Sequence, residues 1–515
     1  MPVEIGDSAS GQALMEGGCK GRTAAMKKRR QWLRGAEPGE HSTDLQSGRW
    51  IDGELARCEF KDARHGKRLR KLLEQLSEEI GGGIPWACQD WANTKAAYRF
   101  FSNDRISEEE ILAGHFQATR DRLAAMGVLI LMLHDTTEFT FHRNDAAAIG
   151  ILNKSHVGRD KEGRPRHYTV CGILMHSSLA VTTDGLPLGL ATIKFWTRDQ
   201  FQGCNALKKK INPTRVPIEQ KESYRWLENV KQSTALCHDP QRCVHIGDRE
   251  SDIYELFCAA QKAGTHFLLR TCVDRLAGDG KHTIADEMEE VRIQGLHRIQ
   301  VRDRKGEVSE AVLEIRYRRI LVLPPIGKQK QYPELTLTVL HAQERGTPRD
   351  RERLDWKLIT DLPVRSREDA IEKLEWYAMR WKIEMFHKIV KSGCKAEESK
   401  LRTAERLVNL IAILCILSWR IFWITMINRT APDASPELAF TELELYLLDY
   451  LVQDKGDVTP RRKSLTGYLT KLARLGGYLA RAHDPPPGNM VMWRGLSRLT
   501  DIELGAIIGA QLVGN

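Results

Sequence analysis

The chain has 515 residues, 42% of them apolar, and its 78 basic and 68 acidic side chains give a formal net charge of +10. This composition supports a buried core in about two to four domains, and it excludes global disorder, collagen and coiled-coil rods. The 11 cysteines are odd in number and irregularly spaced, which favours reduced thiols in a cytoplasmic protein over a disulfide scaffold. The first residues show no signal-peptide pattern, and the basic excess favours a polyanionic partner, nucleic acid before membrane.

The N-terminal part changes character at about residue 50. Residues 1–49 are rich in glycine, serine and charge, have no apolar period, and predict a disordered tail. Residues 50–125 repeat apolar side chains at helical spacing and predict a helical domain. We expect five aromatic side chains to pack it: Trp86, Trp91, Tyr98, Phe100 and Phe101. One of its helices carries a dense basic cluster, either a solvated face or a phosphate-binding surface, that includes Lys67, Arg68, Arg70 and Lys71.

Short apolar runs then alternate with helical segments. The run at 128–133 predicts a strand that is buried on both faces and ends just before Asp135. A hairpin is expected over 170–196, and a short strand at 243–246 ends just before Asp248. If the first and fourth strands of a mixed sheet are neighbours, these two strand ends bring Asp135 and Asp248 side by side.

The second half of the chain begins with a stretch of different composition. Residues 271–365 are strand-like, charged and rich in turns, and predict either a β-rich insertion or a separate β domain. A long helix is expected over 367–391, and mostly helical structure after residue 430. The apolar segment 407–427 is long enough to cross a membrane, but Arg420 within it is costly there. We therefore expect a helix buried in a core or a dimer interface, and no membrane.

Three acids form a candidate catalytic and metal-binding set: Asp135, Asp248 and Glu384. Carboxylates that meet at one point repel one another and are costly to ionise together, unless hard cations bind between them. Two Mg²⁺ (or Mn²⁺) ions about 3.5–4 Å apart would activate an attacking oxygen and stabilise a leaving oxygen in phosphodiester chemistry. Each acid by itself also suits an ordinary turn, N-cap or helix-surface role.

The helix around Glu384 carries a patterned face. Side chains spaced 3, 4, 4 and 3 residues apart lie along it: Tyr377, Arg380, Glu384, Lys388 and Lys391. One interpretation is an exposed face with ion pairs between successive turns. The other is a carboxylate that holds a metal, while the cations and the phenol bind DNA phosphates beside the cleavage site.

This pattern resembles a known family. The series of Tyr377, Arg380, Glu384 and Lys391 is similar to the Tyr-Arg-Glu-Lys signature of the family-four insertion-sequence transposases, which are bacterial DDE transposases. The segments that begin at Asp135 and Asp248 resemble the first and second Asp motifs of the same family. The resemblance covers about residues 50 to 425, and the chain departs from the family in its N-terminal tail and after residue 430.

The resemblance implies an α/β fold with a ribonuclease-H-like mixed sheet flanked by helices. The implied organisation is a tail (1–49), a helical transposon-end DNA-binding domain (50–125), a first part of the catalytic core (126–270), a β-rich insertion (271–365), a completion of the core that carries Glu384 (366–429), and a C-terminal helical region with a possible role in dimerisation (430–515).

The resemblance also implies further DNA contacts. Trp356 matches the tryptophan on which a flipped base stacks, although a core tryptophan fits the sequence equally well. Arg270 matches an active-site arginine, and Trp381 and Lys388 match other DNA-contacting positions.

The implied function is cut-and-paste transposition by a homodimer on double-stranded inverted-repeat ends, through an end hairpin, at the nucleoid in the bacterial cytoplasm. A metal-dependent nuclease without strand transfer and an inactive DNA-binding relative are the alternatives.

Overall fold

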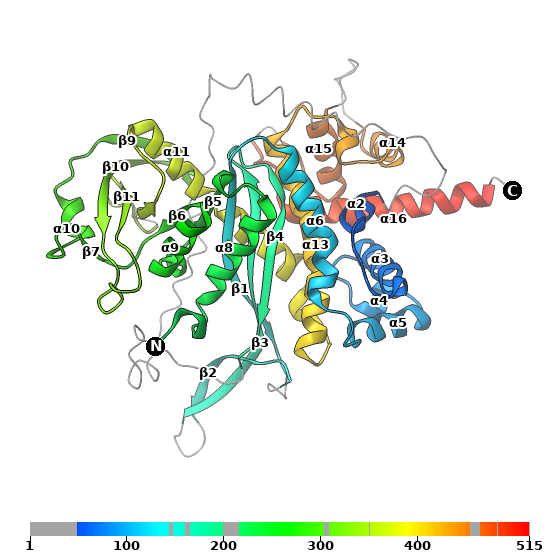
Figure 1. The fold of residues 1–515 in the computed structure, drawn as a ribbon. Helices are drawn as coiled ribbons and strands as arrows, with labels where there is room; N and C mark the ends of the chain where they lie inside the picture. Colours follow the sequence, from blue (N-terminus) through cyan, green and yellow to red (C-terminus); the bar gives the residue numbers. More distant parts are fainter. Residues whose placement is uncertain are drawn as a thin grey trace.

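The computed structural model describes residues 49–143, 148–159, 165–198, 216–302, 308–349, 351–453, 464–481 and 483–513. The predicted tail therefore lies outside the described residues, apart from its last residue. The described chain is mixed α/β, with one twelve-stranded mixed sheet and many helices around it (Figure 1), which is compatible with a ribonuclease-H-like fold.

Five helices open the described chain and lie together on one side of the molecule (Figure 1): α2 (Arg49–Leu55), α3 (Ala63–Glu78), α4 (Ile84–Cys88), α5 (Trp91–Phe101) and α6 (Glu108–Ala125). The inner face of α5 consists of Ala97, Phe100 and Phe101, spaced for one side of a helix and buried. Trp91 lies about half a turn away from that face and is 76% exposed, while Trp86 of the short α4 is 68% exposed. The expectation that aromatic side chains pack the domain is therefore confirmed for Phe100 and Phe101, and it is wrong for Trp86, Trp91 and Tyr98, which is 38% exposed.

A buried carboxylate joins these helices to the rest of the protein. Glu54 of α2 accepts hydrogen bonds from His115 Nδ1 (2.5 Å) and Arg122 Nη1 (2.9 Å) on α6. It also accepts one from the indole Nε1 of Trp419, far along the chain, at 3.1 Å. His115 Nε2 in turn accepts the backbone N–H of Leu190 at 3.0 Å. Three separate segments thus depend on one carboxylate.

The core of the sheet is formed by β1 (Ile130–Phe141), β2 (Ile151–Arg159), β3 (Pro165–Thr182), β4 (Pro187–Trp196), β5 (Cys243–Gly247) and β6 (His266–Arg270). β1 lies between β3, which is antiparallel to it, and β5, which is parallel to it. β4 pairs with β3 as the expected hairpin, and β6 continues the parallel pairing beyond β5. The expected adjacency of β1 and β5 is confirmed.

The apolar run suggested that β1 ends just before Asp135, but the strand continues past this residue. Its parallel pairing with β5 stops at Leu133 and Ile246, but its antiparallel pairing with β3 continues to Phe141. The residues after Asp135 are mostly threonine and phenylalanine, which favour strands, and β3 is long enough to pair with all of them. Asp135 therefore lies inside a strand, at the point where β5 no longer pairs with it.

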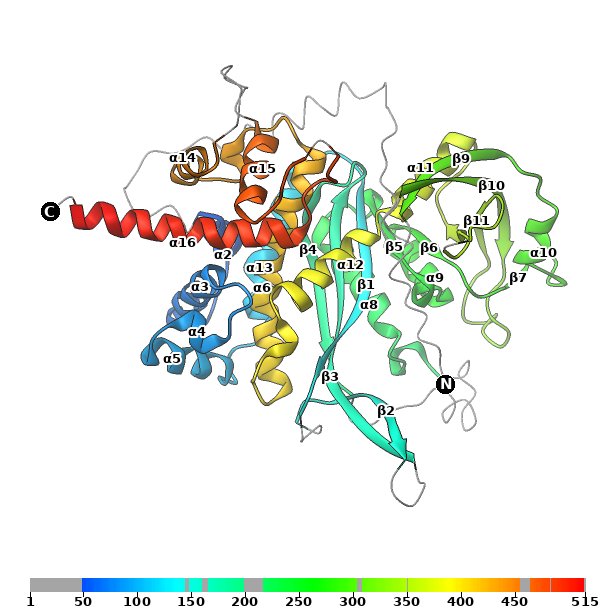
Figure 2. The same ribbon diagram turned by 180° about the vertical axis from the view of Figure 1, so that it is seen from behind.

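The segment predicted as β-rich consists of β7 (Leu276–Ala277), β8 (His282–Thr283), α10 (Ile284–Glu289), β9 (Gly295–Arg302), β10 (Val308–Val322), β11 (Leu335–Glu344) and β12 (Asp355–Thr360). β12 pairs antiparallel with β6, so these strands extend the core sheet and do not form a sheet of their own. They gather at one end of the molecule with α9 (Tyr254–Ala263), around a second apolar cluster (Figure 2).

The long helix predicted over 367–391 is interrupted. The structure has α11 (Arg367–Ala378), α12 (Trp381–Lys388) and a π-helical turn over Ile389–Gly393. At the junction the backbone N–H groups of Arg380 and Ile383 bond to carbonyls three residues back, so the chain tightens there. The single straight face expected for the five patterned side chains is therefore wrong in detail, since both the junction and the π-turn rotate it.

α13 (Ala404–Thr430) is the apolar helix, and it is buried as expected. It is long and apolar enough to cross a membrane, with a mean hydropathy of 2.2, but 94% of its most apolar window is buried inside the protein. Arg420 donates from Nη2 to the carbonyl of Ala439 (2.6 Å) and lies over the Trp423 ring, and burial lowers its pKa. The arginine is thus accommodated by a packed protein interior.

The remaining helices are α8 (Tyr224–Cys237), which covers the sheet, and α14 (Glu442–Leu451), α15 (Leu465–Leu475) and α16 (Asn489–Val513) at the C-terminus. α16 runs past the N-terminal helices and its end projects from the body of the molecule (Figure 2). α15 and α16 approach very closely at Gly495, where an added Cβ would lie 2.0 Å from the Leu472 carbonyl oxygen.

Candidate active site

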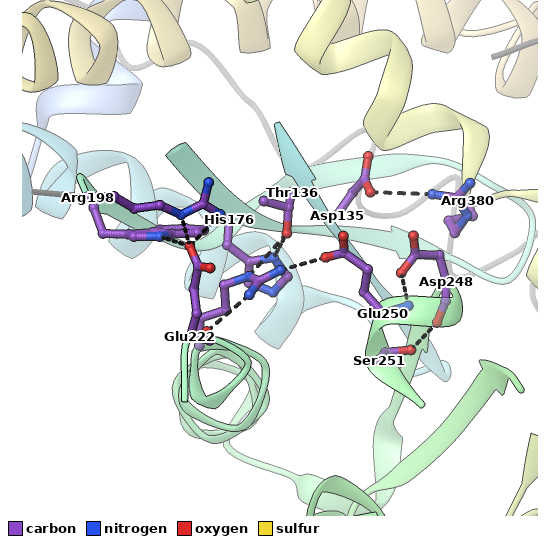
Figure 3. Close-up of polar contacts among 11 residues, drawn as sticks. Asp135, Thr136, His176, Arg198, Glu222, Asp248, Glu250, Ser251 and Arg380 are labelled. Atoms are coloured by element: carbon purple, nitrogen blue, oxygen red, sulfur yellow. Dashed lines mark hydrogen bonds and ion pairs between the residues drawn. The ribbon is translucent and has the colours of Figure 1, made fainter. Parts of the chain in front are cut away.

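Strand register brings the first two acids together. Leu133 of β1 is level with Ile246 of the parallel β5; Asp135 lies two residues further along β1, and Asp248 directly follows the last residue of β5. Side chains two residues apart along a strand point to the same face of a sheet. Figure 3 shows the two carboxylates near each other, with Arg380 beside them.

Arg380 joins the third acid to this pair. Its guanidinium contacts Asp135 Oδ1 at 3.5 Å and Glu384 Oε1 at 2.5 Å. Arg380 is the N-cap residue of α12 and Glu384 lies one turn later, so both side chains project from the same side of the helix toward β1. The Asp135 side chain is 14% exposed and that of Glu384 is 34% exposed, so the cluster is open to solvent on one side.

The charges of the site are strongly coupled. Burial, together with the nearby Asp135 carboxylate, raises the pKa of Asp248 to about 6, against the opposing effect of Arg380. Burial also raises the pKa of Glu384, opposed by Arg380 and aided by Asp135. Although burial disfavours its charge, Arg380 has a raised pKa because Asp135 and Glu384 surround it. The site therefore holds more negative charge than its single arginine compensates.

The three carboxylates are the donor set that the site offers to a divalent metal. Among the described residues, no group of three or more His, Cys, Asp or Glu side chains is already gathered closely enough to hold an ion. The guanidinium of Arg380 lies between Asp135 and Glu384 instead. The chemistry nevertheless fits, because the Asp135 carboxylate raises the pKa of both Asp248 and Glu384, and these three acids provide the oxygen ligands and the charge that Mg²⁺ or Mn²⁺ requires.

His387 also contacts Asp135, and the sequence did not predict this contact. His387 of α12 approaches Asp135 Oδ2 with Nδ1 at 3.5 Å, while its Nε2 lies 2.8 Å from the hydroxyl of Ser177. His387 follows Glu384 by three residues, so helical spacing could have placed it on the same side. The serine could not have been found without the β1–β3 register.

An ion-pair network extends from the acids along the adjacent α8. Arg225 donates from Nη2 to Glu250 Oε2 (2.5 Å) and from Nε to the hydroxyl of Thr136 (3.3 Å). The Thr136 hydroxyl also lies 2.9 Å from His176 Nδ1, and Figure 3 shows these groups next to Asp135 and Asp248. Burial holds the pKa of His176 well below its usual range, so this imidazole is neutral at pH 7.

Tyr377, Arg270 and Trp356 lie together beside the acids. Trp356 is only 8% exposed and packs edge-on against the Tyr377 ring, with 5.5 Å between ring centres. Burial raises the pKa of Tyr377, while Arg380 and Arg270 oppose the shift. Arg270 donates to the backbone carbonyl of Asp355 at 3.2 Å. In this conformation the indole corresponds to the core-tryptophan alternative, and its role as a base platform stays a prediction.

The other DNA contacts predicted on this helix, Lys388, Lys391 and Trp381, lie outside the group of contacts around Asp135. Lys388 is exposed, and Lys391, in the π-helical turn, lies 3.7 Å from Glu397. Trp381 is partly buried between Lys382 and Arg429. In the described part of the chain, no ion pair or hydrogen bond joins these three side chains to Asp135, Asp248 or Glu384.

A pocket of about 650 Å³ opens next to Asp248, between β6, β12 and α10. Its walls include four cations, namely Arg249, Arg270, Arg316 and Lys357, and also three acids, Asp274, Glu289 and Asp355. The pocket extends the charged surface from the acids toward the strands of the β-rich segment.

The basic cluster on α3 is divided between paired and solvent-facing cations. Arg70 is paired with Asp52 and with Glu74, and Arg68 donates to the side chain of Asn93 at 3.1 Å. Lys67 and Lys71 lie one turn apart and are exposed. Only the two lysines are therefore displayed in a manner suited to phosphate contact without rearrangement.

Comparison with known proteins bears on this same region. Residues 47–106, which include α2 to α5, match the protein family described as transposase DNA-binding. The match supports a transposase, a class of DNA-cleaving enzyme, and supports DNA as its partner.

Proposed function

We propose that the protein is a DDE transposase of the family-four type that moves an insertion sequence by cut-and-paste transposition. The observation that carries the proposal is the placement of Asp135 on β1 beside Asp248, which directly follows the end of the adjacent parallel β5, with Glu384 joined to Asp135 through Arg380. The transposase DNA-binding match at residues 47–106 gives this carboxylate cluster its substrate class.

Asp135, Asp248 and Glu384 would hold the two Mg²⁺ or Mn²⁺ ions of the proposed reaction. When bound, such ions supply an activated oxygen nucleophile and stabilise the leaving oxygen of the cleaved phosphodiester. Arg380 is now paired with two of the carboxylates, and its planar donors are equally suited to a DNA phosphate. Tyr377, Arg270, Trp356, Trp381, Lys388 and Lys391 are the proposed DNA contacts around the cleavage site.

The proposed sequence of steps begins with a nick that frees a 3′-hydroxyl at the transposon end. That hydroxyl attacks a phosphodiester of the opposite strand, which forms a hairpin at the transposon end and releases the flanking DNA. Water then hydrolyses the hairpin and regenerates the 3′-hydroxyl, which attacks a target phosphodiester and displaces a target 3′-hydroxyl. A homodimer would hold the two ends together, with the C-terminal helices as the dimerisation region, at the nucleoid of a bacterial cell.

The test uses the purified full chain and a duplex that carries the inverted repeats flanking its own gene. Cleavage is followed on gels with Mg²⁺ or Mn²⁺, with EDTA, and with Glu384→Gln, while end binding is measured by mobility shift. We expect metal-dependent cleavage at the repeat ends that is lost in Glu384→Gln, with end binding retained. Glu250→Gln, which removes a nearby exposed acid, is the matched control and should still cleave.

Strand transfer separates the proposal from its alternatives. A labelled end that joins an intact plasmid supports transposition, and cleavage without joining indicates a nuclease. End binding with no cleavage by the wild-type protein indicates an inactive DNA-binding relative. A wild-type protein that neither binds nor cleaves the repeat ends would overturn the proposal.

A further inference from the structure

We infer that His387, anchored by Ser177, is a positioning residue that fixes the orientation of the Asp135 carboxylate for metal binding. The inference rests on the proposed function, because it assigns a role to residues around a proposed metal ligand. It concerns contacts of the chain itself.

The two oxygens of Asp135 are each approached from α12. Arg380 Nη1 lies 3.5 Å from Oδ1, and His387 Nδ1 lies 3.5 Å from Oδ2. Arg380 precedes Glu384 by four residues and His387 follows it by three, so the two donors flank the glutamate on one side of the helix. The same pair of contacts that orients Asp135 therefore also aligns α12, and Glu384 with it, on the sheet.

Ser177 determines which way the imidazole faces. In the β1–β3 register Ser177 lies directly opposite Asp135, and its hydroxyl is 2.8 Å from His387 Nε2. Ser177 is fully buried and His387 is 5% exposed, so water does not compete for this bond. With the hydroxyl donating to Nε2, Nδ1 carries the hydrogen and presents it to Asp135. A ring flip would place a ring carbon where each nitrogen now lies and lose both contacts.

Orientation by a second layer of hydrogen bonds is a general requirement of carboxylate metal ligands, and its loss typically costs 10- to 100-fold in metal affinity. At 3.5 Å the His387–Asp135 approach is a directed contact and not a closed hydrogen bond. When one oxygen of a carboxylate binds a cation, a hydrogen-bond donor such as His387 Nδ1 can hold the other oxygen. The carboxylate then binds the metal through one oxygen only.

The chain supplies its own matched control. Ser178 follows Ser177, faces the other side of the sheet, is equally buried, and lies 2.7 Å from His134 Nδ1. Ser178→Ala therefore removes a buried serine–histidine contact of the same kind, but one that does not lead to a carboxylate of the site. Ser178 also accepts a hydrogen bond from Asn229 (3.1 Å), so Ser178→Ala removes at least as many buried hydrogen bonds as Ser177→Ala and is a stringent control.

The experiment measures Mn²⁺ binding to the full chain by electron paramagnetic resonance, and cleavage of end DNA as a function of Mn²⁺ concentration. We expect Ser177→Ala and His387→Gln to weaken Mn²⁺ binding about 10- to 100-fold, with cleavage restored at high Mn²⁺ and end binding unchanged. His387→Asn, whose amide nitrogen replaces Nδ1, should stay within about threefold of wild type, as should Ser177→Thr and Ser178→Ala.

The variants separate positioning from simple packing. His387→Gln and His387→Asn remove the same buried ring, so equal impairment of the two would overturn the inference, as would a Ser177→Thr that behaves like Ser177→Ala. A different result would overturn only the inference and leave the proposed function standing: Mn²⁺ binds the wild type but not Glu384→Gln, and binding is unchanged in Ser177→Ala and His387→Gln. If the wild type neither binds Mn²⁺ nor cleaves, the inference and the proposed function fail together.

Discussion

Replacement of Glu54 by glutamine should weaken the attachment of the N-terminal helices to the rest of the protein. The amide keeps the shape of the carboxylate, but it leaves the Arg122 guanidinium without its charged partner and turns an NH₂ group toward one of three donors. Removing one partner of a buried ion pair costs about 3–5 kcal/mol. We expect the loss of stability where α2 packs on α6 and α13, because the contacts of Glu54 join these three helices.

The magnitude can be worked out independently from the protonation equilibrium. Despite burial, which raises it, His115 and Arg122 lower the pKa of Glu54 from 4.5 to about 2. At about 1.4 kcal/mol per pKa unit, this shift corresponds to roughly 3 kcal/mol. Because the folded pKa is depressed, this stability is fully present above about pH 4.5 and is lost as the pH falls toward 2. The two estimates agree within their precision.

The assay is native-state hydrogen exchange of α2 and α6 amides, which reports the free energy of opening of these helices in the intact chain. We expect Glu54→Gln to lower that free energy by about 3 kcal/mol at pH 7 and by the same amount at pH 5.5. Glu59→Gln, an exposed acid of the same segment, should change it by less than about 0.5 kcal/mol. A loss below about 1 kcal/mol, or one that differs between the two pH values, would refute the reasoning.

Three other predictions concern DNA binding, the buried tryptophan and the C-terminal helices. Lys67→Ala and Lys71→Ala should each reduce the salt slope of end-duplex binding by about 0.9, measured by fluorescence anisotropy, whereas the already paired Arg70→Ala should not; equal slopes would contradict this. Trp356→Ala should lower the free energy of unfolding by about 3–5 kcal/mol in chemical denaturation, because the indole is buried against a ring, and a neutral result would favour a free base platform. Gly495→Ala should destabilise the α15–α16 contact by about 1–3 kcal/mol in hydrogen exchange, and wild-type protection there would contradict the close approach.

Sequence patterns predicted the elements that depend on local periodicity. The apolar run before Asp135 is a buried strand, the hairpin forms near Gly185, and the helix that contains Arg420 is buried. These predictions succeed because alternation, turn residues and continuous apolarity are properties of neighbouring residues.

The failures involve information that the local sequence does not contain. The extension of β1 past Asp135 depends on the length of a distant partner strand, and the outward position of Trp91 depends on which side of α5 meets the core. The interruption before Trp381 has no proline or glycine to announce it. The contact of Ser177 with His387 joins residues 210 positions apart, so only the assembled sheet and helix reveal it.

The placement of Asp135 beside Asp248 has a consequence for how this chain can vary in length. Because successive strand residues alternate between faces, deletion or insertion of one residue in β1 or β5 would move one carboxylate to the opposite side of the sheet. A length change in the connections between these strands would not shift either carboxylate to the other face. The same holds for the segment from β7 to β11, which lies at the far end of the sheet. Length changes in related chains should therefore collect in those connections and in that segment, and should be absent from the few residues before each aspartate.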